Sequence, residues 1–218
     1  MPSDHVAIPA GEGPLRLDGT LGRPAGATGL VIFAHGSGSS RLSPRNAAVA
    51  QALQRDGLAT LLFDLLDAAE ARDRGNVFDI PLLGARVAAA LRWAGGVPEL
   101  ARMPTGLFGA STGAAAALAA AAERPEAVAA VVSRGGRPDL AGPALPRVAA
   151  PTRLIVGGRD TEVLRLNEQA RARMRCPGDL KVVEGATHLF EEPGALEEVT
   201  RLASAWFRAH LRPAAAGR

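Results

Sequence analysis

Short apolar segments alternate with longer segments of helical periodicity along almost the whole chain. Eight of the short segments are predicted strands, because they are apolar and bounded by turn residues. They comprise residues 5–8, 14–21, 29–34, 58–65, 105–108, 127–133, 152–156 and 180–183. The helical segments comprise residues 44–55, 80–93, 114–122, 140–148, 163–174 and 195–211. This alternation predicts an α/β fold of about eight strands, a mostly parallel sheet with an antiparallel start and helices on both faces.

Two local patterns refine these boundaries. Ser43 precedes Pro44, and a serine at the N-cap followed by a proline at the first helical position is a typical helix start. Residues 70–76 are rich in charged side chains and are expected to form a loop. No internal repeat occurs, and no insertion is long enough to form a lid or cap domain.

The length of 218 residues suits one domain, since α/β folds often reach about 200–250 residues in a single unit. We expect residues 1–211 to form that domain and residues 212–218 to be a disordered tail. The one cysteine, Cys176, excludes an internal disulfide and is typical of a reducing compartment. The N-terminus lacks the pattern of a secretory signal, and no apolar stretch reaches the ~18 residues of a membrane span. A cytoplasmic protein without a membrane partner is expected.

The formal net charge of +3 does not indicate a nucleic-acid partner. Lys181 is the only lysine, and the arginines are spread along the chain without a basic stripe or interleaved aromatic residues. Most of them are expected to be solvated surface residues. The four histidines are widely separated in the sequence, so no metal-binding cluster is expected.

The run Gly109-Ala-Ser111-Thr-Gly113 lies between a predicted buried strand and a predicted alanine-rich helix. Strand, G-x-S-x-G and helix together define the nucleophile elbow, a tight turn that exposes the serine hydroxyl. Glycines are needed there because side chains would collide with the neighbouring strand and helix. Ser111 is therefore the candidate nucleophile.

A serine hydroxyl needs a base to remove its proton, and a histidine base needs a carboxylate to orient it. His188 follows the last predicted strand and is the candidate base. Asp160 follows the strand before it and is the preferred acid, because Ser, acid and His then follow one another in the order of an α/β-hydrolase. Asp160 could instead cap the helix that follows it. Asp139, after an earlier strand, could supply the acid in its place.

Acyl transfer on a serine also needs an oxyanion hole, formed by backbone N–H groups aimed at the developing alkoxide. Thr112, directly after the nucleophile, is expected to supply one N–H at the start of its helix. The loop at 35–40 is expected to supply the other, with Ser37 as the preferred donor. His35 is expected to hold the backbone of this loop through hydrogen bonds.

The sequence resembles the α/β-hydrolase superfamily and, within it, the small, lidless dienelactone hydrolase-like proteins. The stretches that carry the resemblance are His35-Gly-Ser-Gly-Ser-Ser40, Gly109-Ala-Ser-Thr-Gly113, Gly157-Gly-Arg-Asp160 and Gly185-Ala-Thr-His188. The resemblance implies ester or lactone hydrolysis through an acyl-enzyme. Dienelactone hydrolases use a cysteine nucleophile, whereas this chain has Ser111, so dienelactone is not the expected substrate. Relatives are sometimes fused to a phosphoribosyltransferase domain, which this sequence does not contain.

Four arginines lie in loops after predicted strand ends, where ligands bind to sheets of this kind. These candidate substrate-binding residues are Arg41, Arg45, Arg134 and Arg137. They suggest a carboxylate or phosphate on the substrate. The loop at 36–40 could also cradle a phosphate, but its glycine spacing matches neither the Walker A pattern nor the dinucleotide fingerprint. No cofactor and no metal are expected to be required.

Together these residues predict a serine hydrolase that cleaves small carboxylic esters or lactones, which are its expected small-molecule partners. Acyl transfer or peptidase activity on the same three side chains remains an alternative. A non-catalytic binding protein that has kept the fold is another. Neither the physiological substrate nor the oligomeric state follows from the sequence.

Overall fold

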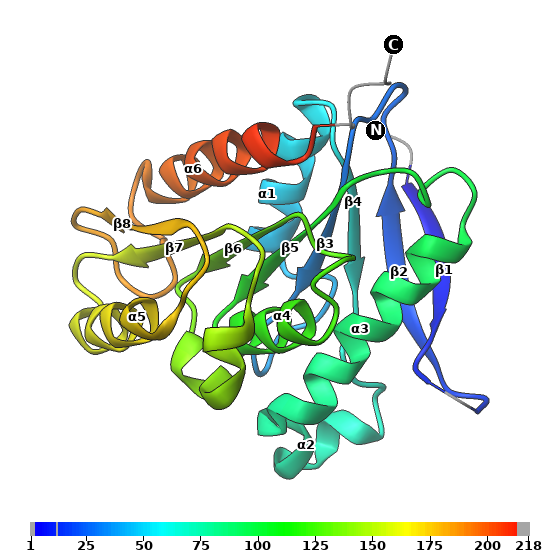
Figure 1. Cartoon of the computed structure of the whole chain (residues 1–218), viewed down its shortest axis with the longest axis horizontal. Coiled ribbons are helices and arrows are strands. Elements are labelled where there is room, and N and C mark those ends of the chain that lie inside the picture. Colours follow the sequence, from blue (N-terminus) through cyan, green and yellow to red (C-terminus); the bar gives the residue numbers. More distant parts are fainter. Residues whose placement is uncertain (1–2, 12, 213–218) are drawn as a thin grey trace.

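A computed structural model describes residues 3–11 and 13–212, and within this part the chain forms one eight-stranded sheet (Figure 1). The strands are β1 (Ser3–Pro9), β2 (Arg16–Gly22), β3 (Leu30–Ala34), β4 (Ala59–Phe63), β5 (Thr105–Ala110), β6 (Ala130–Arg134), β7 (Thr152–Gly157) and β8 (Gly178–Val183). Their order across the sheet is β1-β2-β4-β3-β5-β6-β7-β8. β2 is antiparallel to both its neighbours, and the other pairs are parallel. The predicted α/β fold with an antiparallel start is confirmed.

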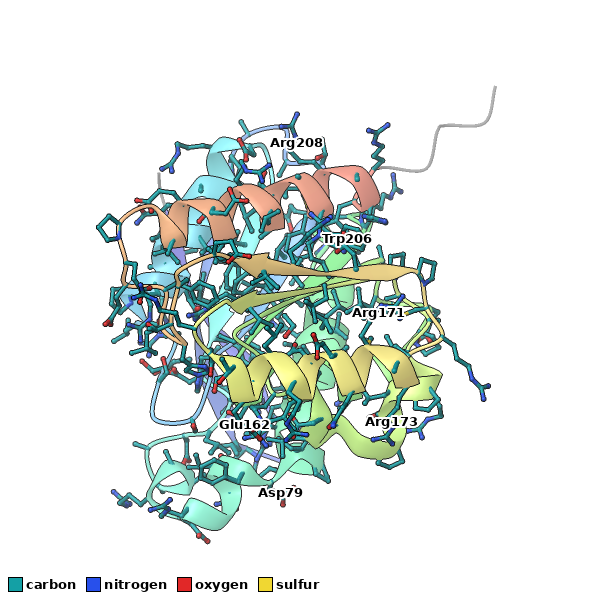
Figure 2. The ribbon with its side chains drawn as sticks, turned by 90° about the vertical axis from the view of Figure 1, so that its left-hand side faces the viewer. Asp79, Glu162, Arg171, Arg173, Trp206 and Arg208 are labelled. Carbon is teal, nitrogen blue, oxygen red and sulfur yellow. The ribbon has the colours of Figure 1, made fainter. Side chains whose placement is uncertain are left out.

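Helices cover both faces of this sheet. They are α1 (Pro44–Arg55), α2 (Arg74–Phe78), α3 (Ile80–Gly96), α4 (Thr112–Glu123), α5 (Thr161–Arg173) and α6 (Ala195–His210), with the 3₁₀ segments η1 (Glu70–Arg72) and η2 (Pro138–Arg147). Helices α1 and α6 pack on one face, and α3, α4 and α5 on the other (Figure 1). Figure 2 shows Trp206 between α6 and the sheet, where the guanidinium of Arg153 stacks on its ring at 4.5 Å.

Burial on both faces explains the continuous apolar runs in the central strands. Every residue of β3, β4 and β6 is buried, as expected for parallel strands sandwiched between helices. Helix α4 is buried almost all round and consists largely of alanine. Its small side chains allow close contact with α3, where a Cβ on Gly84 would lie 3.0 Å from the Cβ of Ala119.

The boundary predictions hold at α1 and fail in the segment before α3. The hydroxyl of Ser43 accepts the N–H of Asn46, and Pro44 begins the helix, as predicted. Residues 70–76 were predicted to be a loop but contain η1 and the start of α2. Asp73 caps α2 by accepting the N–H of Gly75, and Asp67, just before this segment, accepts the N–H of Glu70 in a turn that leads into η1.

The segment predicted as a helix at 140–148 is instead 3₁₀, and it breaks at Gly142, where φ is 49°. Pro143 and Pro146 lack the N–H that an α-helix needs there, which accounts for the tighter, interrupted form. Of the predicted tail, 213–218 lie outside the described residues. Within the described chain, no helix combines the length and apolarity required to cross a bilayer.

Candidate active site

Ser111 forms the turn between β5 and α4. The strand ends at Ala110 and the helix begins at Thr112, so one residue makes the whole change of direction. Its backbone has φ 51° and ψ −124°, a conformation that non-glycine residues rarely adopt and that commonly marks a functional position. The N–H of Ser111 donates to the carbonyl of Arg134 at 3.3 Å, which ties the turn to the end of β6.

The glycines around Ser111 are required by close backbone contacts. A Cβ on Gly109 would lie 2.4 Å from Cα of Ala114, and one on Gly113 would lie 2.2 Å from the carbonyl oxygen of Ala34. Neither neighbour is a flexible side chain, so neither can move aside. The elbow therefore needs glycine at both positions, which is the physical reason for the motif.

His188 and Asp160 are hydrogen-bonded, with Nδ1 of the imidazole 2.6 Å from Oδ2 of the carboxylate. They come from the loops that follow β8 and β7, two adjacent parallel strands. The side chain of Asp160 is 16% exposed and that of His188 is 37% exposed. Asp160 occupies the N-cap position of α5, yet its side chain makes no capping hydrogen bond. Its carboxylate is directed to His188 instead of the helix.

Asp139 has a different partner. Both of its carboxylate oxygens accept from the guanidinium of Arg137, at 2.9 and 2.8 Å. Hydrogen bonding to Asp139 raises the pKa of Arg137, the expected effect of a carboxylate on a paired guanidinium. Of the two aspartates considered from the sequence, the structure therefore brings Asp160, and not Asp139, to the imidazole.

The nucleophile cavity, defined here as the cavity of about 210 Å³ that contains Ser111, also has His188 in its wall. Its other walls include Gly36, Ser37 and Arg134. The cavity lies at the carboxyl ends of the parallel strands, where ligands bind to open α/β sheets. The structure thus gathers the serine, the imidazole and the loop at residues 35–40, called the oxyanion loop after its expected role, around one space.

The N–H of Ser37 is engaged in this structure, contrary to its expected availability as an oxyanion donor. It donates to the side-chain oxygen of Thr112 at 2.9 Å. Thr112 is buried at the first turn of α4, and its hydroxyl is directed to the loop. The N–H of Thr112 lies at the N-terminus of the same helix, where backbone donors lack partners within the helix. In this structure the N–H of Ser37 is therefore not available as an oxyanion donor, and the role of the Thr112 N–H stays a prediction.

His35 fixes the oxyanion loop in the manner predicted. Its Nε2 accepts the N–H of Leu65 at 3.1 Å, and its Nδ1 lies 2.9 Å from the carbonyl oxygen of Gly36. A ring nitrogen that accepts from a backbone N–H carries no proton, so Nδ1 is the donor to Gly36. Burial lowers the pKa of His35 and favours this neutral form.

The four candidate arginines fall into two pairs. Arg134 and Arg45 line the nucleophile cavity. Arg41 is ion-paired with Asp64 at 2.7 Å, and Arg137 is held by Asp139. Arg45 also has a carboxylate partner, Glu191, at 2.9 Å. Only the first pair faces the space beside Ser111.

Asn46 lies in the site but was not predicted from the sequence. It is 3% exposed, and its Oδ1 accepts from Nη2 of Arg134 at 3.1 Å. The available signal was a polar residue at helical spacing from Val49 and Leu53, on the apolar face of α1. Metal binding has no comparable support, because no group of three or more His, Cys, Asp or Glu side chains in the described residues could hold an ion.

Comparison with known proteins agrees with this architecture. A family model described as the alpha/beta hydrolase fold matches residues 29–154, more than half of the chain. Proteins from two strains of Mycobacterium tuberculosis are 57% identical over 199 residues and carry the provisional name of phosphoribosyl transferase. The match covers 91% of this chain and 45% of those proteins, so the chain spans less than half of their length.

Solved structures resemble the chain over nearly its full length. The crystal structure of dienelactone hydrolase from Anabaena variabilis has 54% identity and a TM-score of 0.94, covering 97% of this chain and 99% of that one. Est1E from Butyrivibrio proteoclasticus shares the fold, with 16% identity and a TM-score of 0.80 over 94% and 98% of the two chains. This chain therefore belongs to the α/β-hydrolase family, in its dienelactone hydrolase-like group. Fold and relatives together support a hydrolase activity.

Proposed function

We propose that the protein is a serine hydrolase that cleaves small carboxylic esters or lactones through an acyl-enzyme. The observation that carries this proposal is the 2.6 Å hydrogen bond between Asp160 and His188, because His188 lines the same cavity as Ser111. A carboxylate on Nδ1 leaves Nε2 free to act as a base and stabilises the imidazolium that then forms.

In the first half of the reaction, Oγ of Ser111 attacks the substrate carbonyl while Nε2 of His188 takes the hydroxyl proton. The tetrahedral intermediate collapses, and His188 returns that proton to the oxygen of the leaving alcohol. In the second half, His188 takes a proton from water, and the resulting hydroxide attacks the acyl-enzyme. The second tetrahedral intermediate then breaks its bond to Oγ of Ser111, and His188 gives its proton to that oxygen. The carboxylic acid leaves, and the serine hydroxyl and the neutral imidazole are restored.

The oxyanion is held by the N–H of Thr112, at the positive end of α4. Ser37 supplies the second N–H once the Thr112 hydroxyl rotates away from it. This N–H then donates to the negatively charged oxyanion instead of the neutral hydroxyl oxygen. Charged acceptors make the stronger hydrogen bonds, so the exchange favours the transition state over the free enzyme.

A fluorophosphonate probe tests the nucleophile directly, because it reacts with activated serines and is recorded by mass spectrometry. We expect labelling at Ser111 in the parent protein and none in Ser111→Ala. Hydrolysis of a panel of esters, lactones and amides should be lost in the same variant. Parental turnover of a good ester by Ser111→Ala would refute the proposal.

Acyl transfer and peptidase action on the same residues are the alternatives within this chemistry. Product analysis with alcohol and amine acceptors, and with amide substrates, separates them from hydrolysis. The phosphoribosyl transferase name belongs to relatives more than twice as long, and we propose that the matched part contributes the hydrolase. A non-catalytic role for the fold would be indicated by failure of Ser111 to react with the probe.

A further inference from the structure

Arg134 is a buried cation that has no anionic partner among the described residues. It is 6% exposed, and its one side-chain hydrogen bond within the described chain goes to the neutral amide of Asn46. Its Nε is buried without a partner, and the ring of Phe190 lies 5.9 Å from the guanidinium carbon. Among the described residues, no carboxylate lies within ion-pairing distance of this side chain.

A buried charge of this kind destabilises the folded protein unless an opposite charge compensates it. Burial, together with the positive charge of Arg45, lowers the pKa of Arg134 to about 10, which leaves it protonated at neutral pH. An apolar side chain at this position would avoid that cost. The charge is therefore better explained by a ligand than by packing.

The position of Arg134 identifies where that ligand lies. Arg134 lines the nucleophile cavity beside Ser111, and Arg45 and Asn46, from the first turn of α1, line the same cavity. Arg45 is ion-paired at 2.9 Å with the largely exposed side chain of Glu191, so the uncompensated charge in this part of the cavity is that of Arg134. This part of the cavity therefore attracts an anion.

A second, apolar cavity of about 360 Å³ adjoins the first. The two share Gly36, Ser37 and Ser39 of the oxyanion loop. The apolar side chains around the second cavity come from the segment between β4 and α3 and from α3 itself, and they are Leu65, Leu66, Ala68, Ala71, Val77 and Leu83. A substrate with its carbonyl at Ser111 can thus extend into a positively charged space and into an apolar one.

We propose that the substrate carries an anionic group, a carboxylate or a phosphate, that binds Arg134 and Asn46, and an apolar group that fills the adjoining cavity. This inference rests on the proposed function, since it takes Ser111 as the site of ester cleavage. Arg134 and Asn46 act as specificity residues in it, and the reaction itself is unchanged.

Matched ester pairs test the anionic half. Each pair has a free carboxylate or phosphate, placed in the acyl or the alcohol part, and a neutral carboxamide in its place. We expect kcat/KM for at least one charged ester to exceed that of its neutral partner by tenfold or more. Equal values, or a preference for the neutral ester, in every pair would overturn the inference.

Two variants assign that preference to residues. Asn46→Asp supplies Arg134 with an internal carboxylate at 3.1 Å without changing side-chain size, and Arg134→Met removes the charge. Both should reduce the charged-to-neutral ratio of kcat/KM by tenfold or more. Arg208→Met, on an exposed position of α6 (Figure 2), removes the same charge away from the cavity and should leave the ratio unchanged. Equal loss with both esters would instead indicate a structural role and overturn the assignment.

Thermal unfolding keeps this test independent of folding defects. Asn46→Asp and Arg134→Met relieve an uncompensated charge, so neither should lower Tm by more than a few degrees. Added glutarate or inorganic phosphate should raise the Tm of the parent more than that of Asn46→Asp. A large loss of Tm in both variants, with no stabilisation of the parent by either anion, would contradict the proposal.

The apolar half is tested by chain length, since Ala71→Phe should narrow the second cavity and shift the preferred ester to shorter chains. An unchanged chain-length preference in Ala71→Phe would refute the apolar half of the proposal. Ser111→Ala separates the two levels of inference. Inactivity of Ser111→Ala together with no charge preference in the parent would reject this inference alone, whereas an active Ser111→Ala would reject the proposed function.

Discussion

The carboxylate of Asp160 lies 2.6 Å from Nδ1 of His188, across a separation of 28 residues in the sequence. The short parallel strands β7 and β8 bring the two together, because the loops after their carboxyl ends leave the sheet side by side. The same aspartate stands at the N-cap of α5 without capping it. Its side chain is therefore available to orient the imidazole.

Asp160→Asn should reduce kcat by about 10⁴-fold, because an amide can hold the imidazole in the wrong tautomer and cannot stabilise the imidazolium. Asp139→Asn is the matched control. Its carboxylate is bound to Arg137, so kcat should change less than about threefold, which is under 1 kcal/mol of transition-state stabilisation. Steady-state kinetics on one neutral ester checks both. If kcat fell more in Asp139→Asn than in Asp160→Asn, the assignment of Asp160 as the acid would be wrong.

The backbone of Ser111 stores strain that glycine would relieve. A non-glycine residue at φ 51° and ψ −124° costs of order 1–3 kcal/mol, and the extra chain entropy of glycine offsets about 0.5–1 of this. Ser111→Gly should therefore be inactive and about 1 kcal/mol more stable than the parent, whereas Ser111→Ala should be inactive without that gain. Urea unfolding of the three proteins measures the difference. Equal stability of the two variants would show that the turn is not strained.

Stability should fall in mild acid because of His35. Its pKa in the folded protein lies below the unfolded value of about 6.5, so the unfolded chain binds more protons between the two values. The contribution of His35 to the free energy of unfolding is fully present above about pH 6.5. It is lost as the pH falls below that value, by up to about 1.4 kcal/mol per pH unit for one proton. Protonation also removes the acceptor for the N–H of Leu65.

His35→Gln removes this titration, so its free energy of unfolding should depend less on pH between 7.5 and 5.5 than that of the parent. His5→Gln replaces an exposed histidine on β1 and serves as the control, with the parental dependence retained. Urea unfolding at three pH values is the measurement. Parallel curves for the parent and His35→Gln would mean that another group controls the acid sensitivity.

Gly36→Ala should impair catalysis by crowding the nucleophile. A Cβ at this position would lie 2.8 Å from Cβ of Ser111 and 3.1 Å from the carbonyl oxygen of Ala110. Displacement of the serine or the loop by a fraction of an ångström should lower kcat/KM by about 10²-fold. Gly95→Ala, in α3 with nothing within 4 Å, should retain activity and gain up to about 1 kcal/mol of stability. Full activity of Gly36→Ala would show that the loop tolerates displacement.

The central strands were the easiest to predict, because burial on both faces demands apolar residues throughout. Each observed strand overlaps its predicted segment, and β3, β4 and β6 are buried along their whole length. The segment at 70–76 was not predictable from charge alone. Asp73 in this segment caps α2 by accepting the N–H of Gly75, and sequence does not tell a capping aspartate from a solvated one.

Side-chain partners were the least predictable part of the site. The sequence allowed Asp160 or Asp139 as the acid, and the choice depends on which carboxylate Arg137 occupies. The four arginines looked alike in the sequence, although in the described part of the chain a carboxylate is bonded to Arg41 and none to Arg134. The sequence also did not reveal that the N–H of Ser37 donates to the hydroxyl of Thr112, because this hydrogen bond joins residues 75 positions apart.

The order of strands and helices, the elbow at Ser111 and the family were determined by the sequence itself. These features depend on local periodicity and on glycines that permit close backbone contact, both of which neighbouring residues encode. The pairing of Asp160 with His188, the engaged N–H of Ser37 and the unpaired charge of Arg134 were decided only by the tertiary structure. Hydrogen bonds and desolvation act over a few ångströms, so they depend on which distant segments the sheet brings together.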